Sequence, residues 1–151
     1  MRTNFLLITA LMMLSACSGG KKKEIDTSKK AGKTPVIESA DDITAHPGHD
    51  VYTLHCLPCH QADGNGVPGM YPTLHDTEWV NGDTETLISI VLHGMDEEIE
   101  VNGEVFSMVM APLPHLTDLE VADVLNYVRK RFGTADGSIT PEQVGEVRDE
   151  G

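Results

Sequence analysis

The sequence predicts an all-α domain in which three main helices are joined by long loops. Three segments place apolar residues at helical spacing and are flanked by residues that begin or end helices. Connections of roughly twenty residues separate these segments, and loops of that length mean either a wrong assignment or loops that enclose something. Aromatic residues make up only 5% of the chain. Aliphatic side chains or a group that the gene does not encode must therefore supply much of the core.

The first two helices are expected to be short. One covers about 47–58 and the other about 85–93. Asp83 or Thr84 caps the second of these helices, and Gly94 ends it.

The third helix has the strongest signals. Residues 117–120 form a Thr-x-x-Glu capping box, and Gly133 ends the helix. Three basic residues lie in its last turn, where their charge interacts favourably with the helix dipole. The apolar positions between these ends are Val121, Val124, Leu125, Val128 and Phe132.

Composition divides the chain into four parts. Residues 1–16 read as a lipoprotein signal peptide, and 17–45 as a lipidated Cys followed by a flexible tether rich in Ser, Gly and Lys. Residues 46–133 form the folded domain. We expect the Gly-, Asp- and Glu-rich stretch 134–151 to be an acidic, disordered tail.

The N-terminal segment indicates export. Arg2 precedes an apolar run over 5–14, which is too short to span a bilayer but suits a secretory signal. Residues 14–17, Leu-Ser-Ala-Cys, resemble the bacterial lipobox, which implies acylation of Cys17 and attachment to a membrane through N-terminal acyl chains. An ordinary signal peptide that happens to contain a cysteine is the alternative.

The charge of the chain argues against nucleic acid as a partner. Eleven Lys and Arg stand against 24 Asp and Glu, so the net charge is −13. Within 46–133 the only basic residues are Arg129, Lys130 and Arg131.

The chemistry lies in Cys56-Leu57-Pro58-Cys59-His60. Cys-x-x-Cys-His is the attachment signature of c-type haem, in which two thiols reach the vinyl groups of one porphyrin edge and the histidine binds iron. A thioredoxin-like dithiol would need a βαβ context. A zinc site would need two further ligands, for which only His49 and His55 lie close in sequence.

With this motif, residues 46–133 resemble the class I (mitochondrial-type) cytochrome c family. Gly48, Tyr52 and Cys56 match its N-terminal helix, and Val124 with Tyr127 matches the C-terminal helix that crosses at that glycine. The resemblance implies the cytochrome c fold, with its loops wrapped around one covalently attached haem c.

The resemblance also implies a sixth iron ligand, to be chosen among Met70, Met95, Met108 and Met110. Met110 precedes a proline-rich turn and the capped final helix, as in the family, although Ala111 stands where the family often has proline. We therefore expect His60 and Met110 as axial ligands, with Met108, Met95 or a histidine as the alternatives to Met110. An apolar cavity should lie between Cys56, His60 and Met110.

Two further residues are expected around the haem. Pro72 resembles the family's proline whose carbonyl accepts a hydrogen bond from the proximal imidazole, with Pro68 as the alternative. Trp79 either donates its indole N–H to a haem propionate or is simply buried. The remaining histidines are read as surface or loop residues: His46, His49, His55, His75, His93 and His115.

His/Met ligation leaves iron no open site and so favours one-electron transfer over catalysis. The expected function is a lipid-anchored carrier on the periplasmic side, which gives electrons to a terminal oxidase or reductase or serves as haem subunit of a quinol-oxidising complex. The alternatives are an electron-accepting subunit of a periplasmic dehydrogenase, and a haem sensor or peroxidase. The negative charge of the domain has two interpretations. It forms an acidic rim of the haem crevice that meets a basic partner, because four acidic residues closely precede Met110: Glu97, Glu98, Glu100 and Glu104. Otherwise it forms a face that only makes the protein soluble.

Overall fold

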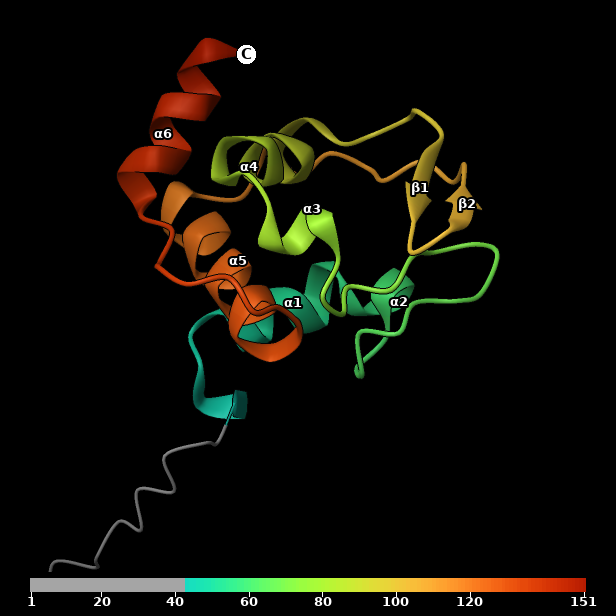
Figure 1. Ribbon diagram of the computed structural model, residues 1–151. Helices are drawn as coiled ribbons and strands as arrows, with labels where there is room; N and C mark the ends of the chain where they lie inside the picture. Colours follow the sequence, from blue (N-terminus) through green and yellow to red (C-terminus); the bar gives the residue numbers. More distant parts are fainter. Residues whose placement is uncertain (1–42) are drawn as a thin grey trace, which may run out of the picture. The chain divides into compact units, whose positions relative to one another are not determined.

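The computed structural model describes residues 43–151, and this part of the chain is mainly helical (Figure 1). The helices are η1 (Ile43–Ala45), α1 (Gly48–His55), α2 (Leu57–His60), α3 (Glu78–Asn81), α4 (Thr84–His93), α5 (Asp118–Phe132) and α6 (Pro141–Glu150). The strands β1 (Ile99–Val101) and β2 (Glu104–Phe106) form an antiparallel hairpin with Glu100 opposite Val105. The predicted helical class is confirmed. The signal segment, Cys17 and the tether up to residue 42 lie outside the described residues.

The three predicted helices are present. The first is divided at Cys56, where α1 ends and α2 begins. The side chain of Asp83 accepts a hydrogen bond from Thr86 N at 2.8 Å and so caps α4. At the start of α5, Thr117 and Glu120 form the expected capping box.

Helices α1 and α5 are in direct contact. A Cβ atom on Gly48 would overlap the Asp123 carbonyl and lie 2.7 Å from Val124 Cα, so only glycine permits this approach. The rings of Tyr52 and Tyr127 stack beside it with centroids 5.2 Å apart. This is the crossing that the resemblance implied.

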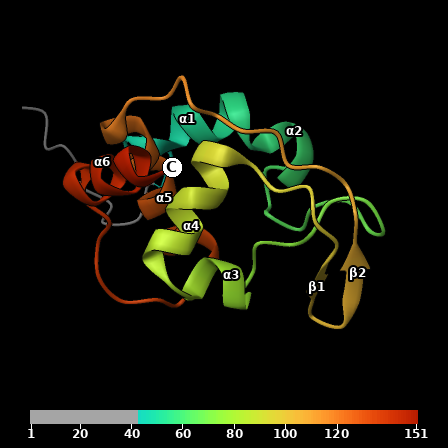
Figure 2. The same ribbon diagram turned by 90° about the horizontal axis from the view of Figure 1, so that it is seen from above.

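Figure 2 shows α1, α4, α5 and α6 gathered on one side, with the β1–β2 hairpin on the other. The core lies among these helices, and its completely or almost completely buried aliphatic residues include Val80, Ile88, Leu92, Val121, Val124 and Val144. No helix within residues 43–151 combines the length and apolar character that crossing a bilayer requires.

The C-terminal expectation was wrong, because residues 141–150 form α6 instead of a disordered tail. Thr140 and Gln143 form a second capping box, and Pro141 occupies the first turn. Val144 of α6 is fully buried, Ile139 just before the helix is buried, and Val147 packs against the core, so a few apolar residues dock a mostly polar stretch. At the other boundary, Ile43 of η1 packs on the core, so residues 43–45, which were predicted to belong to the tether, are part of the folded domain.

The two long loops contain elements that were not predicted. α3, capped by Thr77, interrupts the first loop, and the β1–β2 hairpin interrupts the second. The hairpin turns at Asn102 and Gly103, which both have positive φ, at +53° and +83°. Asn-Gly is the preferred pair for this kind of turn.

Candidate functional site

A cavity of about 260 Å³ lies within the described residues. It is bounded by α2, α4, the hairpin, α5 and the segment before α5. Cys56, Cys59, His60 and Met110 all line it, as expected. Much of the remaining lining is aliphatic, including Leu74, Val80, Leu87, Val91, Leu125 and Val128.

One turn of backbone presents both thiols and the imidazole. His60 N donates to Cys56 O at 2.9 Å, and Cys59 N donates to the same carbonyl at 3.2 Å. Neither Cys56 nor Cys59 forms a disulfide with a residue of the described part of the chain. Burial, with a smaller contribution from Cys59, raises the pKa of the Cys56 thiol to about 12.

The imidazole of His60 is oriented by a backbone carbonyl. Its Nδ1 lies 3.1 Å from Pro72 O. A carbonyl only accepts hydrogen bonds, so Nδ1 carries the proton and Nε2 keeps the lone pair that a metal requires. Burial lowers the pKa of His60, and the Pro72 hydrogen bond opposes that shift. The proline that contacts His60 is therefore Pro72, as expected, and not Pro68.

Met110 is held by a short backbone bridge. Met110 N donates to Met95 O at 2.8 Å, and Met95 N donates to Met110 O at 3.0 Å. Of the four candidate methionines, Met95, Met108 and Met110 line the cavity and Met70 does not. Met108 is 52% exposed, whereas Met95 and Met110 are half-buried.

Trp79 brings an unsatisfied donor to the cavity. Its side chain is part of the lining, and its Nε1 is buried with no hydrogen-bond partner among the described residues. A buried N–H without an acceptor is costly. An anionic group inside the cavity, such as a haem propionate, would satisfy it. An apolar chamber with two thiols, a free imidazole lone pair and an orphaned donor fits a haem.

Arg129 does not line the cavity but supports the elements around it, and sequence reasoning missed this role. It was assigned only to the helix dipole, but its guanidinium is buried and donates to Val80 O, Gly82 O and Thr84 Oγ1 at 2.9–3.1 Å. These bonds fix the junction of α3 and α4, and α3 carries Trp79. One basic residue among three consecutive ones gives no sequence signal for burial.

The other histidines are mostly engaged in local structure. His46 Nδ1 accepts from Gly48 N at 3.2 Å, and His75 Nε2 donates to Asp63 O at 2.6 Å. His55 differs from the expectation of a surface residue, because it lines the cavity, with its ring centroid 5.3 Å from that of His115.

The structure does not support the two alternatives to haem. Within residues 43–151, no three His, Cys, Asp or Glu side chains are grouped in a way that could hold a metal ion, so the Cys pair is not completed to a zinc site. The strands in the same range form only an antiparallel hairpin. The βαβ context of a thioredoxin-like dithiol is not formed there.

Comparison with known proteins places these features in context. Residues 45–131 match the family described as Cytochrome c. Cytochrome c-552 of Thermus thermophilus is 38% identical over 110 residues, which cover 67% of this chain and 83% of that relative. The cytochrome c subunit of alcohol dehydrogenase (quinone) from Gluconacetobacter polyoxogenes is 33% identical over 109 residues, which cover 70% of this chain and 23% of that subunit. The cbb3-type cytochrome c oxidase subunit FixP of Azorhizobium caulinodans is 27% identical over 143 residues, which cover 91% of this chain and 45% of that subunit.

Proposed function

The chain belongs to the cytochrome c family, whose members carry covalently bound haem c and transfer electrons, and on this premise we propose that it is a membrane-tethered one-electron carrier of a respiratory chain. The observation that carries the proposal is the cavity that Cys56, Cys59, His60 and Met110 line together. The bound group supplies an Fe(II)/Fe(III) couple.

Each residue has a separate task in this proposal. Cys56 and Cys59 would hold the haem through thioethers, and His60 and Met110 would supply the nitrogen and the sulfur that bind its iron. Pro72 fixes the tautomer of His60 through the 3.1 Å hydrogen bond, which also increases the basicity of Nε2. The aliphatic lining excludes water, and with both axial positions filled no site is left for a substrate.

Spectra of protein matured with the c-type attachment machinery test these roles. A pyridine haemochrome spectrum and the intact mass should show one thioether-linked haem, and its absence would end the proposal. The oxidised protein should have the weak iron–sulfur band, and Met110→Ala should lose it. Met95→Ala and Met108→Ala are the matched controls that keep it. Loss of the band in either control, with retention in Met110→Ala, would assign the ligand to that residue instead.

A second candidate function is an electron-accepting subunit of a periplasmic dehydrogenase. The 33% identity with an alcohol dehydrogenase cytochrome subunit favours it, although the match covers only 23% of that subunit. Neighbouring genes that encode a dehydrogenase, together with its copurification, would support this candidate. Neighbouring genes for an oxidase or a quinol-oxidising complex would support the carrier.

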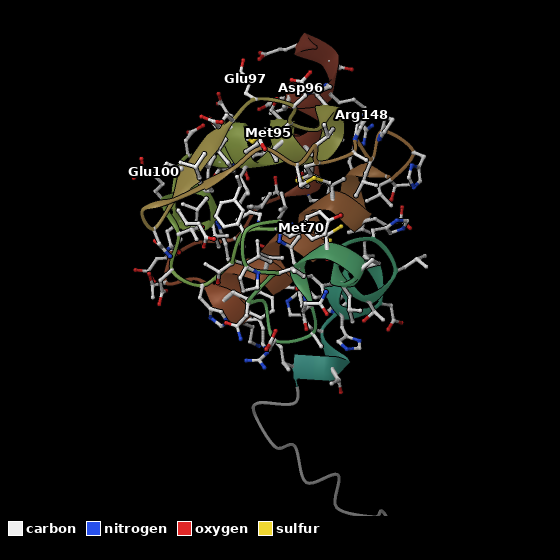
Figure 3. All side chains as sticks on the ribbon, turned by 90° about the vertical axis from the view of Figure 1, so that its right-hand side faces the viewer. Met70, Met95, Asp96, Glu97, Glu100 and Arg148 are labelled. Carbon is white, nitrogen blue, oxygen red and sulfur yellow. The ribbon has the colours of Figure 1, made fainter. Side chains whose placement is uncertain are left out.

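The partner is proposed to present basic residues to the side of the molecule shown in Figure 3. Carboxylates of the hairpin region are exposed there, with Asp96, Glu97 and Glu100 labelled, and Glu97 lines the cavity. Met70, labelled in the same view, is an apolar side chain that is 44% exposed, and Val109, which lines the cavity, is 61% exposed. An apolar contact with a charged rim suits a transient encounter.

Ionic strength tests this polarity. As salt rises from about 10 to 200 mM, the screening length falls from roughly 30 Å to under 10 Å. The rate of electron transfer to the physiological partner should fall accordingly. A rate that rises with salt would mean an acidic partner, and a constant rate would mean an apolar encounter.

Attachment to the membrane is proposed to depend on acyl chains at Cys17, with the haem domain on the periplasmic side. The support is the sequence Leu14-Ser15-Ala16-Cys17 after an apolar run. Cys17→Ser should move the haem protein to the soluble fraction. Continued membrane association of that variant would show that something other than lipidation holds the protein there.

A further inference from the structure

Arg148, near the end of α6, is bonded to the segment that follows Met110. Its Nε lies 2.8 Å from Asp118 Oδ1, its Nη1 donates to Pro114 O at 3.0 Å, and its Nη2 donates to Leu116 O at 2.7 Å. All three guanidinium nitrogens are therefore used on residues 114–118, which connect Met110 to α5. Charge-assisted bonds of this kind are stronger than neutral ones.

The segment between Met110 and α5 has limited means of holding itself in place. Pro112 and Pro114 have no N–H to donate. Of residues 111–117 only Leu116 is buried, and Leu113 N donates to Val91 O at 2.9 Å. The guanidinium supplies donors to carbonyls that a proline-rich turn leaves without a regular partner.

Helix α6 is a fixed base for Arg148. Val144 is fully buried against the core formed with α4 and α5. The side chain of Asn126 on α5 accepts from Ile139 N and donates to Ile139 O, both at 2.8 Å, directly before α6 begins. If residues 114–118 moved, their bonds to Arg148 would have to break, because α6 is held by the core and could not move with them.

We propose that Arg148 is a positioning residue that holds the Met110 segment in place and so controls how readily an external ligand replaces Met110. The inference rests on the proposed function, in which Met110 is an axial ligand. Replacement requires the segment to move away from the cavity, and the three bonds to Arg148 oppose that movement. Because Arg148 and Asp118 side chains are 30% and 40% exposed, water replaces part of what is lost, and the effect is moderate.

Imidazole binding to the oxidised protein tests the proposal, with loss of the iron–sulfur band as the readout. Arg148→Gln should bind imidazole about tenfold more tightly, the equivalent of about 1.4 kcal/mol. Arg148→Lys keeps the charge but has a single nitrogen, and we expect an intermediate affinity. Lys130→Gln is the matched control, because it removes one positive charge from an exposed position on α5 and should leave the affinity unchanged.

A second variant distinguishes a loss of α6 packing from a loss of the positioning of the Met110 segment. Asp118→Asn leaves α6 intact but weakens the contact to Arg148 Nε, and we expect imidazole to bind about two- to threefold more tightly. A lower melting temperature in Arg148→Gln with unchanged imidazole affinity would show a merely structural role and overturn the proposal. A parent protein without the iron–sulfur band would contradict the proposed function instead.

Discussion

The cavity has one wall around His60, the His60 wall, and another around Met110, the Met110 wall. The contacts that hold the two walls come from residues at different distances along the chain. On the His60 side the bonds next to the histidine are local, because Pro72 accepts from the imidazole and Gly66 N donates to His60 O at 3.1 Å. Farther along this loop, Asp76 N donates to Phe132 O of α5 and Gly69 N donates to Glu104 of the hairpin, both at 2.9 Å. On the Met110 side the support comes from the end of α4, from the bridge to Met95 and from Arg148, which lies 34 residues beyond Pro114.

This difference decides how each wall responds to a local disturbance. Where the bonds around a residue join near neighbours, that part of a loop can adjust together with them and relieve a steric conflict. A segment tied at both ends to packed helices cannot yield without breaking those ties. The Met110 wall is therefore expected to be the less tolerant of the two.

The largest effect is expected from Gly94→Ala. Gly94 has φ +79°, and an added Cβ would lie 2.5 Å from Met110 O and 2.9 Å from Pro112 N. Strain and steric conflict together should lower the free energy of unfolding by about 3 kcal/mol and weaken the iron–sulfur band. Denaturant unfolding and the visible spectrum measure both.

Gly103→Ala is the control for backbone strain alone. Gly103 has φ +83° and nothing within 4 Å of its added Cβ. Gly103→Ala should lower the free energy of unfolding by about 1 kcal/mol and leave the iron–sulfur band unchanged. Equal losses in the two variants would show that the Met110 wall does not resist displacement.

A smaller effect is expected from Gly66→Ala on the His60 wall. Gly66 has φ +67°, and its added Cβ would meet the carbonyls of Tyr71 and Pro72, the latter at 2.5 Å. The loop can shift, so the loss of unfolding free energy should be about 2 kcal/mol. The iron–sulfur band should persist, while the reduction potential rises because His60 loses basicity with its Pro72 bond.

Gly69→Ala, with φ +70° and open space around its added Cβ, is the matched control for this loop. It should keep the parent potential. If Gly66→Ala abolished the iron–sulfur band, or cost more than Gly94→Ala, the order of the two walls would be reversed.

The smallest effect is expected from Trp79→Phe, which touches neither ligand wall. It removes a buried Nε1–H that has no partner among the described residues. Unfolding free energy should change by less than about 1 kcal/mol. If the N–H binds a haem propionate, its loss raises the pKa of that propionate, so the pH range over which the potential falls should move upward by roughly one unit. An unchanged pH profile would mean that the N–H serves no propionate.

The same contrast explains what the sequence could predict. The His60 wall follows from a five-residue motif and a proline twelve positions on, and Pro72 was expected in its place. The helix caps at Asp83 and Thr117 could also be predicted from the sequence, because each cap joins residues three positions apart. The Gly48 contact required the family resemblance, since nothing near Gly48 in sequence identifies its partner on α5.

The missed features depend on contacts between distant segments. Arg129 is buried because α3 and α4 offer it two carbonyls and a hydroxyl, and no local pattern shows this. Val144 and Ile139 are buried and hold α6 on the core. The stretch around them is polar, so its composition predicted disorder, although few apolar residues are enough to dock the helix. The hairpin was different, because Asn102-Gly103 is a readable turn signal that was overlooked.

The contact between α1 and α5 also constrains the order in which the chain can fold. Gly48 meets Asp123 and Val124, so this pairing joins elements that lie far apart in the sequence. Such a distant contact forms only after the intervening chain has lost its loop-closure entropy. The segment with Cys56 and Cys59 directly follows α1, so we expect it to stay outside the packed core until α5 has closed on α1. Both thiols are accessible to an attachment enzyme throughout that interval.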